Sequence, residues 1–560
     1  MQADLYKLNN KTIIFLFITA ILFGFFLVYS DINKGMFTDS YVNLRMSRDI
    51  GVFFNNDSSG IYNENVLYPI LIKAFSLFFS HQKAALFINM IFLSIGGLFF
   101  YLTVKRLNGS NLSALFSLIL FLTNPLILFW NLRVMPDICF MSLICVFLYF
   151  IIEKKMVPSI CIFLLMCLLR SEGILLLPLF LYEKRLRDKR VIIISLCLIV
   201  LFGVFFSKSL IFNSKLAFES ISKVDIKTNL KNHILNIPYN LDISVAMLFF
   251  FSLFYMIRLD KQKKRFIVVG YTFLVYFFMN VFWPFVQFRH WLPFIPAIYM
   301  LISEFFYFLE KAIKKEDKLK KLWIIVIPLF LYTAYGSFDV SINRIRESSD
   351  AMMDADLAGQ YSKNTKAVIF TNIPEILYWY SPDKEIHDFQ DYEWLLANIE
   401  KIGEVEFILS DKKFKKKIDW PDILKIEKRF ESTYKFVYPC FPAQGAENSW
   451  KFLDKKNKLI TVGTDIYKLD KLKFLMMFAT DAFALKDYDL SAFYLKKALI
   501  FVKNSDVNIL NDINSKLKIT LYNSIKKSED KEKINRLIKE ALSIPVLPEL
   551  DDKIKGMRNE

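Results

Sequence analysis

The chain has 560 residues, of which 54% are hydrophobic and 58 are phenylalanine, and its formal net charge is +17. So large an apolar fraction needs lipid around it, which argues against a soluble protein and for a polytopic membrane protein. Almost all of the positive excess lies in residues 1–338, whereas residues 339–560 are close to neutral. Because basic residues beside apolar segments set membrane orientation, we attribute this excess to topology and expect no nucleic-acid partner.

The first membrane span is predicted at residues 12–29, a nearly continuous apolar run of the length that crosses a bilayer. Its end makes a poor small-residue cleavage site, so we expect an uncleaved anchor. An acid and two cations come next, Asp39, Arg45 and Arg48, and Tyr41 lies between them at helical spacing. Such a group at one membrane surface could handle a lipid-linked anionic substrate.

Basic clusters alternate with the apolar segments, and the positive-inside rule assigns them to the cytoplasm together with the N-terminus. These clusters lie at residues 7–11, 105–106, 154–155, 184–190, 258–265 and 311–321. The apolar segments between them must then cross the membrane in pairs. After the first span we expect crossings at residues 84–104, 112–130, 135–152, 191–207, 242–257, 266–283, 291–309 and 322–338, with an external loop at 208–240. The last crossing leaves the remainder of the chain outside.

One apolar segment, residues 156–182, has basic clusters at both ends and is too short to cross twice as a helix that rises roughly 1.5 Å per residue. The polar residues Arg170, Ser171, Glu172 and Gly173 lie in its middle. We predict two half-depth helices joined by a polar turn that is buried in protein or faces a cavity, where Arg170 and Glu172 could pair. The total is then about eleven transmembrane helices.

The predicted external tail has two parts after a membrane domain of residues 1–338. Residues 339–470 are predicted to form a small α/β domain, because short β-rich runs alternate there with a helical pattern at 391–402. These runs are residues 367–370, 405–409 and 459–462. Residues 471–560 are predicted to be a helical tail, in which the pattern at 482–499 is similar to one tetratricopeptide-type hairpin.

Four landmarks in the membrane domain occur in a fixed order. They are Asp39-Ser40-Tyr41 in the first external loop, residues 63–69 ending in Tyr68-Pro69, Asn124-Pro125 followed by Arg133 and Asp137, and Arg289-His290 with Pro293 and Pro296 at the start of a late span. Together they resemble the GT-C glycosyltransferases, polytopic enzymes that use polyprenyl- or dolichyl-phosphate sugars. The branch with the strongest likeness is the protein mannosyltransferase and aminoarabinose transferase group.

Two features depart from that group. The aminoarabinose transferases carry a lysine ahead of the helix along the membrane, whereas Leu67 and Tyr68 precede Pro69 here. Eukaryotic mannosyltransferases often pair two acids after the first span, whereas Ser40 follows Asp39 here. The resemblance therefore implies the superfamily and does not identify the sugar.

The chemistry explains the two acids. A polyprenyl phosphate is already a good leaving group, so transfer needs a base for the acceptor hydroxyl and cations for the departing phosphate. Asp39 is the candidate base, and the resemblance implies inversion at the anomeric carbon. Asp39 could instead cap the following helix, although Thr38 could fill that role. Asp137 is predicted to bind sugar hydroxyls, and the alternative is favourable placement at the positive end of a helix.

Arginine suits phosphate because its planar fork donates two parallel hydrogen bonds. Arg289 is the first candidate to bind phosphate, and Arg45 and Arg48 come next; each could instead be an interfacial anchor. His290 either adds a donor or caps a helix, and Tyr41 is placed with the substrate-binding residues.

No cofactor and no metal site are expected. Five of the six cysteines fall in apolar segments and no Cys-x-x-Cys occurs, so neither a disulfide framework nor a zinc site is indicated. The sequence does not indicate a divalent ion between Asp39 and the phosphate, and nothing in it forms a dedicated metal cage.

We therefore predict a multi-pass glycosyltransferase of the inner (plasma) membrane. It would pass a sugar from a polyprenyl phosphate to a lipid, glycan or protein acceptor, with the extracytoplasmic tail helping to hold the acceptor. An O-antigen-type polymerase or ligase is an alternative, although its functional residues usually lie in a large late loop. A polytopic transporter would show interrupted helices in matching halves, and a membrane-anchored interaction protein would leave the first-loop cluster without a purpose.

Overall fold

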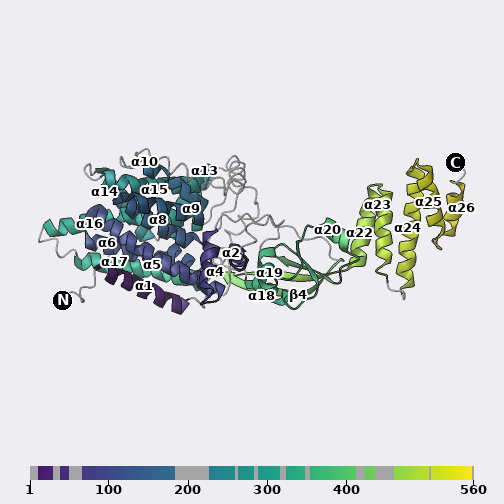
Figure 1. Cartoon of the computed structure of the whole chain (residues 1–560), viewed down its shortest axis with the longest axis horizontal. Helices are drawn as coiled ribbons and strands as arrows, with labels where there is room; N and C mark the ends of the chain where they lie inside the picture. The colour runs from purple at the N-terminus through teal and green to yellow at the C-terminus, as the bar shows by residue number, and fades with distance from the viewer. Residues whose placement is uncertain are drawn as a thin grey trace. The chain divides into compact units, whose positions relative to one another are not determined.

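The computed structural model describes residues 10–29, 38–49, 66–182, 226–241, 243–258, 263–282, 288–315, 323–346, 353–411, 423–435, 459–502 and 506–557. The chain divides into two compact units (Figure 1). The first comprises residues 1–353 with 433–461, and the second comprises residues 354–432 with 462–560.

The first unit is a bundle of mostly apolar helices, as the sequence predicts. Its α-helices and 3-10 helices (η) are α1 (Asn10–Tyr29), α2 (Thr38–Arg48), α4 (Leu67–Phe75), α5 (His81–Asn108), α6 (Asn111–Leu122), α7 (Pro125–Asn131), α8 (Asp137–Ile152), α9 (Met156–Leu169), η1 (Ser171–Leu176), α10 (Pro178–Tyr182), α13 (Ile226–Leu241), α14 (Ile243–Arg258), α15 (Lys263–Phe282), η3 (Phe288–Phe294), α16 (Ile295–Lys315) and α17 (Trp323–Arg346). Among the described residues, two helical stretches, His81–Asn108 and Arg289–Lys315, are by length and composition able to cross a membrane on their own. The crossing predicted at 191–207 lies outside the described residues, and the total number of crossings stays a prediction.

The crossing predicted at residues 112–130 is bent by 57° between α6 and α7. Asn124 caps α7 by accepting hydrogen bonds from the backbone N–H groups of Leu126 (2.9 Å) and Ile127 (3.2 Å), and Pro125 occupies the first turn. Proline has no N–H to continue the preceding helix, so the cap starts a new helix in a new direction. Counted as one broken span, α6 and α7 bring the apolar crossings to three.

The polar turn predicted within residues 156–182 lies between α9 and η1. Arg170 ends α9 in an extended backbone conformation, with φ −154° and ψ 133°. The chain then folds back tightly on α9, because a Cβ at Gly173 would lie 3.0 Å from the backbone nitrogen of Cys167. Any larger residue at this position would force one of the two backbones to shift, so glycine suits this close approach.

Helices α5 and α8 pack closely through small residues. A Cβ at Gly96 of α5 would lie 2.7 Å from the Cβ of Ser142 of α8, so the two helices meet where a side chain is missing. Small residues at helix contacts are typical of membrane bundles, in which van der Waals packing replaces the hydrophobic effect. This contact fixes α8, whose first residue is Asp137.

The second unit contains a five-stranded mixed sheet in the order β2-β1-β3-β5-β4. β1 pairs in parallel with β2 and β3, and β3 pairs antiparallel with β5. The strands are β1 (Val368–Thr371), β2 (Ile386–Asp388), β3 (Val405–Ser410), β4 (Leu424–Lys435) and β5 (Leu459–Leu469), and the helices beside them are α18 (Met353–Ser362), α19 (Pro374–Tyr380) and α20 (Tyr392–Asn398). The β-rich runs of the sequence fall on β1, β3 and β5, whereas β2 and β4 were not predicted.

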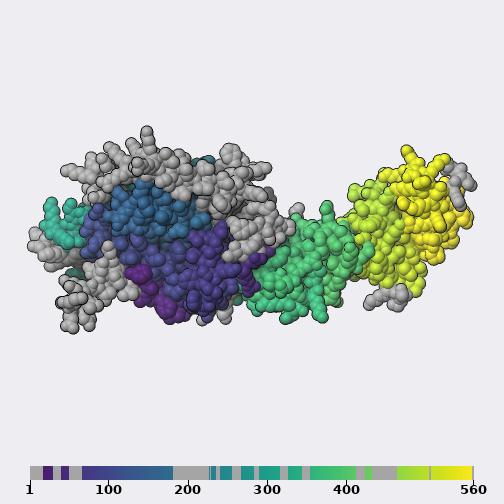
Figure 2. All heavy atoms as spheres, in the orientation of Figure 1, coloured from purple at the N-terminus to yellow at the C-terminus, as the bar shows by residue number. Residues whose placement is uncertain are grey.

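Helices follow the sheet to the end of the chain. They are α22 (Lys471–Ala484), α23 (Tyr488–Leu499), α24 (Val507–Lys527), α25 (Lys531–Leu542), η5 (Pro548–Leu550) and α26 (Asp551–Gly556). α22 and α23 form a helical hairpin over residues 471–499, so the pattern at 482–499 covers α23 and only the end of α22. α24 with α25 adds a second pair, which the sequence pattern does not indicate (Figure 1). One hydrophobic core joins Phe370 and Phe407 of the sheet to Leu495 and Ile554 of the helices, and Figure 2 shows the two parts as one continuous surface. The domain boundaries at 338/339 and 470/471 stay predictions.

Candidate active site

The structure brings together two of the predicted site residues, Asp39 and Arg289. Asp39 lies in the first turn of α2, and Arg289 is the second residue of η3. The Nη1 atom of Arg289 donates to Oδ2 of Asp39 at 2.7 Å. The Asp39 side chain is 54% exposed and that of Arg289 is 19% exposed, so the acid is open to solvent while the cation is largely enclosed.

Helix α2 begins at Thr38, so Asp39 lies inside the helix and not at its cap. Tyr41 is fully buried, Arg45 is half-buried and Arg48 is exposed. At 3.6 residues per turn, Arg48 lies roughly half a turn around the helix from Asp39. Its charge acts on His81 at the start of α5, so the structure does not place Arg48 with the Asp39–Arg289 pair.

Asp137 is almost completely buried at the first position of α8, with 2% of its side chain exposed. Nη1 of Arg170 donates to its Oδ1 atom. The same guanidinium forms a fork with Glu172, from Nη2 to Oε1 at 2.6 Å and from Nε to Oε2 at 3.2 Å. The Arg170–Glu172 pair was foreseen as a possibility from the sequence, but the participation of Asp137 was not. A signal for this contact was available, because Asp137 is a second acid in an apolar segment and a buried carboxylate needs a cation such as Arg170 as its partner.

His290 is buried beside Arg289, and the charges of Arg170 and Glu172 act on its ring. Its backbone carbonyl accepts a hydrogen bond from Nδ2 of Asn280 at 2.7 Å. The ring of His290 therefore lies within electrostatic range of both Arg289 and Arg170.

A second set of contacts holds η3 in place, and sequence reasoning missed it. Nε1 of Trp291 donates to Nδ1 of His233 at 3.2 Å, and Nε2 of His233 lies 3.1 Å from the carbonyl oxygen of Asn280. Because an indole N–H can only donate, Nδ1 of His233 is the acceptor. Nε2 therefore carries the hydrogen and donates to the backbone carbonyl of Asn280. Helices α13 and α15 thereby position the turn that carries Arg289.

The other landmarks of the sequence form hydrogen bonds that connect the helices around the same site. The Tyr68 hydroxyl contacts Oδ1 of Asn89 at 3.2 Å, and Nδ2 of Asn89 donates to the Arg133 carbonyl at 2.7 Å. Nδ2 of Asn124 lies 3.0 Å from the Tyr299 hydroxyl. The Tyr-Pro landmark thus ties α4 and α5 to the turn that precedes Asp137, and the Asn-Pro landmark ties the start of α7 to α16.

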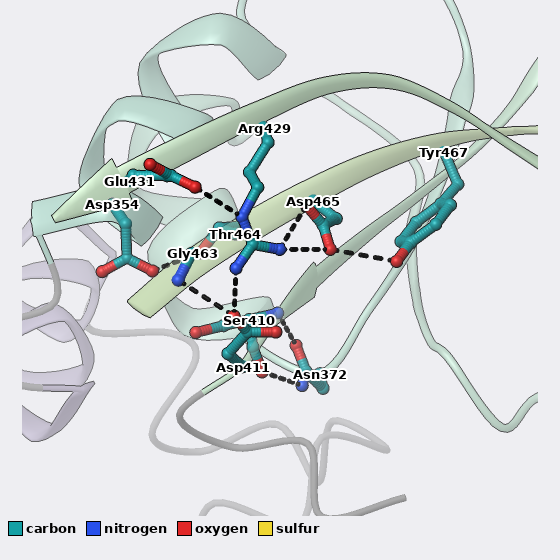
Figure 3. Close-up of polar contacts among 10 residues, drawn as sticks. All are labelled: Asp354, Asn372, Ser410, Asp411, Arg429, Glu431, Gly463, Thr464, Asp465 and Tyr467. Atoms are coloured by element: carbon teal, nitrogen blue, oxygen red, sulfur yellow. Dashed lines mark hydrogen bonds and ion pairs between the residues drawn. The ribbon is translucent and has the colours of Figure 1, made fainter. Parts of the chain in front are cut away.

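A separate polar cluster lies on the sheet of the second unit (Figure 3). Arg429 donates from Nη1 to both oxygens of Asp465 (2.9 and 2.8 Å), from Nη2 to Asp411 (2.6 Å) and from Nε to Glu431 (3.0 Å). Burial lowers the pKa of Arg429, but the hydrogen bonds to Asp411 and Asp465 outweigh it and raise this pKa above its ordinary value. Burial and the carboxylate of Asp465 raise the pKa of Tyr467 to about 12. This cluster joins β4 to β5 and to the end of β3.

Within the described part of the chain, no group of three or more histidine, cysteine, aspartate or glutamate side chains could hold a metal ion.

No protein-family model matches the chain, and no curated protein matches it. The structure is similar to that of ArnT from Cupriavidus metallidurans bound to undecaprenyl phosphate, with a TM-score of 0.49 and 12% identity over 80% of this chain and 97% of that chain. The same protein in the apo state gives a TM-score of 0.47 at 12% identity, with the same coverage. Because similarity at this level indicates the fold alone, the activity has to be inferred from the residues of the site.

Proposed function

We propose that this protein is an integral-membrane glycosyltransferase that transfers a sugar from a polyprenyl-phosphate donor to a lipid, glycan or protein acceptor outside the cytoplasm. The observation that carries the proposal is the 2.7 Å contact of Asp39 with Arg289. It joins a solvent-open carboxylate after the first predicted span to a guanidinium at the start of a long apolar crossing. Base and phosphate ligand are the two groups that this reaction needs.

The reaction is a single displacement. The acceptor oxygen forms a bond to the anomeric carbon of the sugar while its proton passes to the carboxylate of Asp39. The bond between that carbon and the phosphate oxygen breaks, and the departing polyprenyl phosphate keeps the electron pair. The guanidinium of Arg289 stabilises the charge that grows on this oxygen, which is how a fixed cation accelerates a displacement.

The same two residues suggest how donor binding prepares the acid. Arg289 donates to Asp39 in this structure, and a phosphate offers the guanidinium a more highly charged partner with bidentate geometry. A bound donor would therefore compete with Asp39 for Arg289. The released carboxylate, already 54% exposed, would then face the acceptor hydroxyl.

The remaining predicted residues take secondary roles in this scheme. Asp137 would accept hydrogen bonds from the sugar, and His290 would line the space between sugar and phosphate. Tyr41 is buried in α2 and would support the helix that carries Asp39, while Arg45 would meet lipid phosphates along the membrane surface and Arg48, on the far side of α2, would be an interfacial anchor.

Membrane orientation is the part of the proposal that is tested first. The basic clusters favour a cytoplasmic N-terminus and an external tail. A reporter that is active only outside the cytoplasm should be active when fused after Glu560 and silent when fused at Lys264. The reverse pattern would put Asp39 and Arg289 on the cytoplasmic side and overturn the proposed site.

The activity itself is tested by mass spectrometry of envelope glycolipids and glycoproteins from cells with and without the protein. We expect at least one species that is heavier by a single sugar residue only when the wild-type protein is present. Cells with Asp39→Asn at the same protein level should lack that species. Identical profiles in all three strains would contradict a transferase.

A further inference from the structure

Three charged side chains meet inside the helical unit, at the junction of α8, α9 and η1. Arg170 bridges Asp137 and Glu172, and its guanidinium lies 6.0 Å from the ring centre of Phe140. With two acids and one cation, the cluster carries one net negative charge. Charges within a membrane domain are rare and usually functional, because removing them from water is expensive.

The backbone around Arg170 is built for this contact. The Arg170 N–H donates to the Met166 carbonyl at 2.8 Å, and the Gly173 N–H donates back to the Arg170 carbonyl at 3.0 Å. The Tyr276 hydroxyl of α15 donates to the Glu172 carbonyl at 3.2 Å. The turn is therefore held by α9 and α15, and the fork with Glu172 holds the guanidinium.

The fork with Glu172 determines which atom of Arg170 faces Asp137. Nε and Nη2 are both engaged by Glu172, so Nη1 points to Asp137 and holds Oδ1. The other carboxylate oxygen of Asp137, Oδ2, is buried and has no hydrogen-bond partner. A buried acceptor without a donor is unfavourable, and a ligand hydroxyl or amino group would satisfy it.

We propose that Arg170 is a positioning residue that fixes Asp137 so that Oδ2 accepts a hydrogen bond from the donor sugar. This inference rests on the proposed glycosyl transfer. We expect recognition of the sugar to depend on Arg170 and Glu172, although neither residue touches the substrate. Recognition of the lipid phosphate should not depend on them.

The test uses the full-length protein and compares undecaprenyl phosphate with a panel of synthetic polyprenyl-phosphate sugars that bear a pentose, a hexose or an amino sugar. Wild-type protein should bind at least one sugar-bearing lipid more tightly than undecaprenyl phosphate. Arg170→Lys keeps the charge but loses the fork, so this preference should fall about tenfold. Its affinity for undecaprenyl phosphate should stay within about twofold of wild type.

A matched control lies at the other end of α8. Arg106 of α5 pairs with Glu153, the residue that follows α8, at 2.7 Å, and its side chain is 56% exposed. Arg106→Lys should leave both affinities unchanged. If Arg170→Lys fails to fold, Arg170→Gln combined with Glu172→Gln keeps the net charge of the cluster and supports the same measurement.

The outcomes separate the two proposals. If wild type binds undecaprenyl phosphate and prefers a sugar-bearing lipid, but Arg170→Lys retains the full preference, the positioning role is wrong and the transferase stands. If wild type shows no preference for any sugar, Asp137 does not read the sugar and the inference also fails. If wild type binds none of these lipids and Arg289→Ala changes nothing, the proposed function fails and takes the inference with it.

Discussion

Two arginines of this protein each hold carboxylates with all three guanidinium nitrogens, but in different surroundings. Arg429, on the sheet of the second unit, uses every nitrogen of its guanidinium on Asp411, Glu431 and Asp465, and its side chain is 38% exposed. Arg170, in the helical unit, is 14% exposed and leaves Oδ2 of Asp137 buried without a partner. The contacts of Arg429 lie beside water and join neighbouring strands. Those of Arg170 lie away from water and leave one carboxylate oxygen, Oδ2 of Asp137, able to accept a hydrogen bond from a ligand.

The Asp39–Arg289 pair shares features of both networks. Its acid is exposed like Asp411 and Glu431 beside Arg429, yet its cation is largely enclosed like Arg170. An exposed ion pair contributes little to stability, so a pair of this kind is easily exchanged for a ligand. The comparison therefore predicts that changes in the helical unit reduce activity more than stability, whereas changes around Arg429 do the reverse.

The largest expected effect comes from Asp39→Asn, which keeps the shape of the side chain and removes its ability to accept a proton. Transfer should fall by about 10²–10⁴-fold, the range for loss of a general base, while the protein level and thermal unfolding temperature stay normal. The rate of sugar transfer in membranes measures this. Asp49→Asn, at the other end of α2, is the control and should transfer normally. If Asp49→Asn is inactive and Asp39→Asn is active, the base lies there instead.

The next effect concerns Arg289. Lysine keeps the charge but loses the two-pronged geometry, so Arg289→Lys should weaken binding of undecaprenyl phosphate by about tenfold, and Arg289→Ala by about 100-fold. Titration of the purified variants with that lipid gives both numbers. Arg48→Lys, on the far side of α2 from Asp39, should bind like wild type. An interfacial anchor behaves differently, because lysine snorkels equally well and both lysine variants would then match wild type.

The sequence reveals those features of the site that depend on local pattern. Asp39 is visible because it follows an apolar run, and Arg289 because it precedes one. The contact between them joins residues 250 positions apart, and the tertiary packing of η3 against α13 and α15 creates it. The pairing of Arg170 with Asp137 likewise depends on how α9 folds back on α8, which no local pattern records.

The same reasoning explains which strands were missed. β1 and β3 are central and buried, so their apolar runs stand out. β2 has only three residues, too few for a pattern, and β4 lies at the edge of the sheet. Edge strands carry charges that discourage pairing with other chains, and β4 has lysine, arginine and glutamate along its length.

A smaller effect is expected from Arg429→Gln, which removes the cation shared by three carboxylates. Asp411, Glu431 and Asp465 would then repel one another, and β4 and β5 should lose about 1–2 kcal/mol of local stability after allowance for the exposure of the arginine. Hydrogen exchange of the amides in β4 and β5 measures this loss. Lys468→Gln on β5, which removes an exposed pair with Glu404, should change exchange far less. Binding of undecaprenyl phosphate should be unaffected by either change, and weaker binding by Arg429→Gln would refute a purely structural role for this cluster.

The smallest expected effect is a pH dependence of stability that arises from Tyr467, which contacts Asp465 of the same cluster. Its hydroxyl contacts Oδ2 of Asp465 at 3.0 Å, and its pKa in the folded protein is about 12, compared with 10.0 ordinarily. Because the folded state favours the neutral form, this contribution to stability is fully present below pH 10 and is lost as the pH rises through 12. Tyr467→Phe cannot ionise, so its stability should fall less steeply between pH 10 and 12, by about 1 kcal/mol after allowance for partial exposure. Thermal unfolding of both proteins across this range gives the difference. Parallel curves would show that neither burial nor Asp465 raises the pKa of Tyr467 in the folded protein.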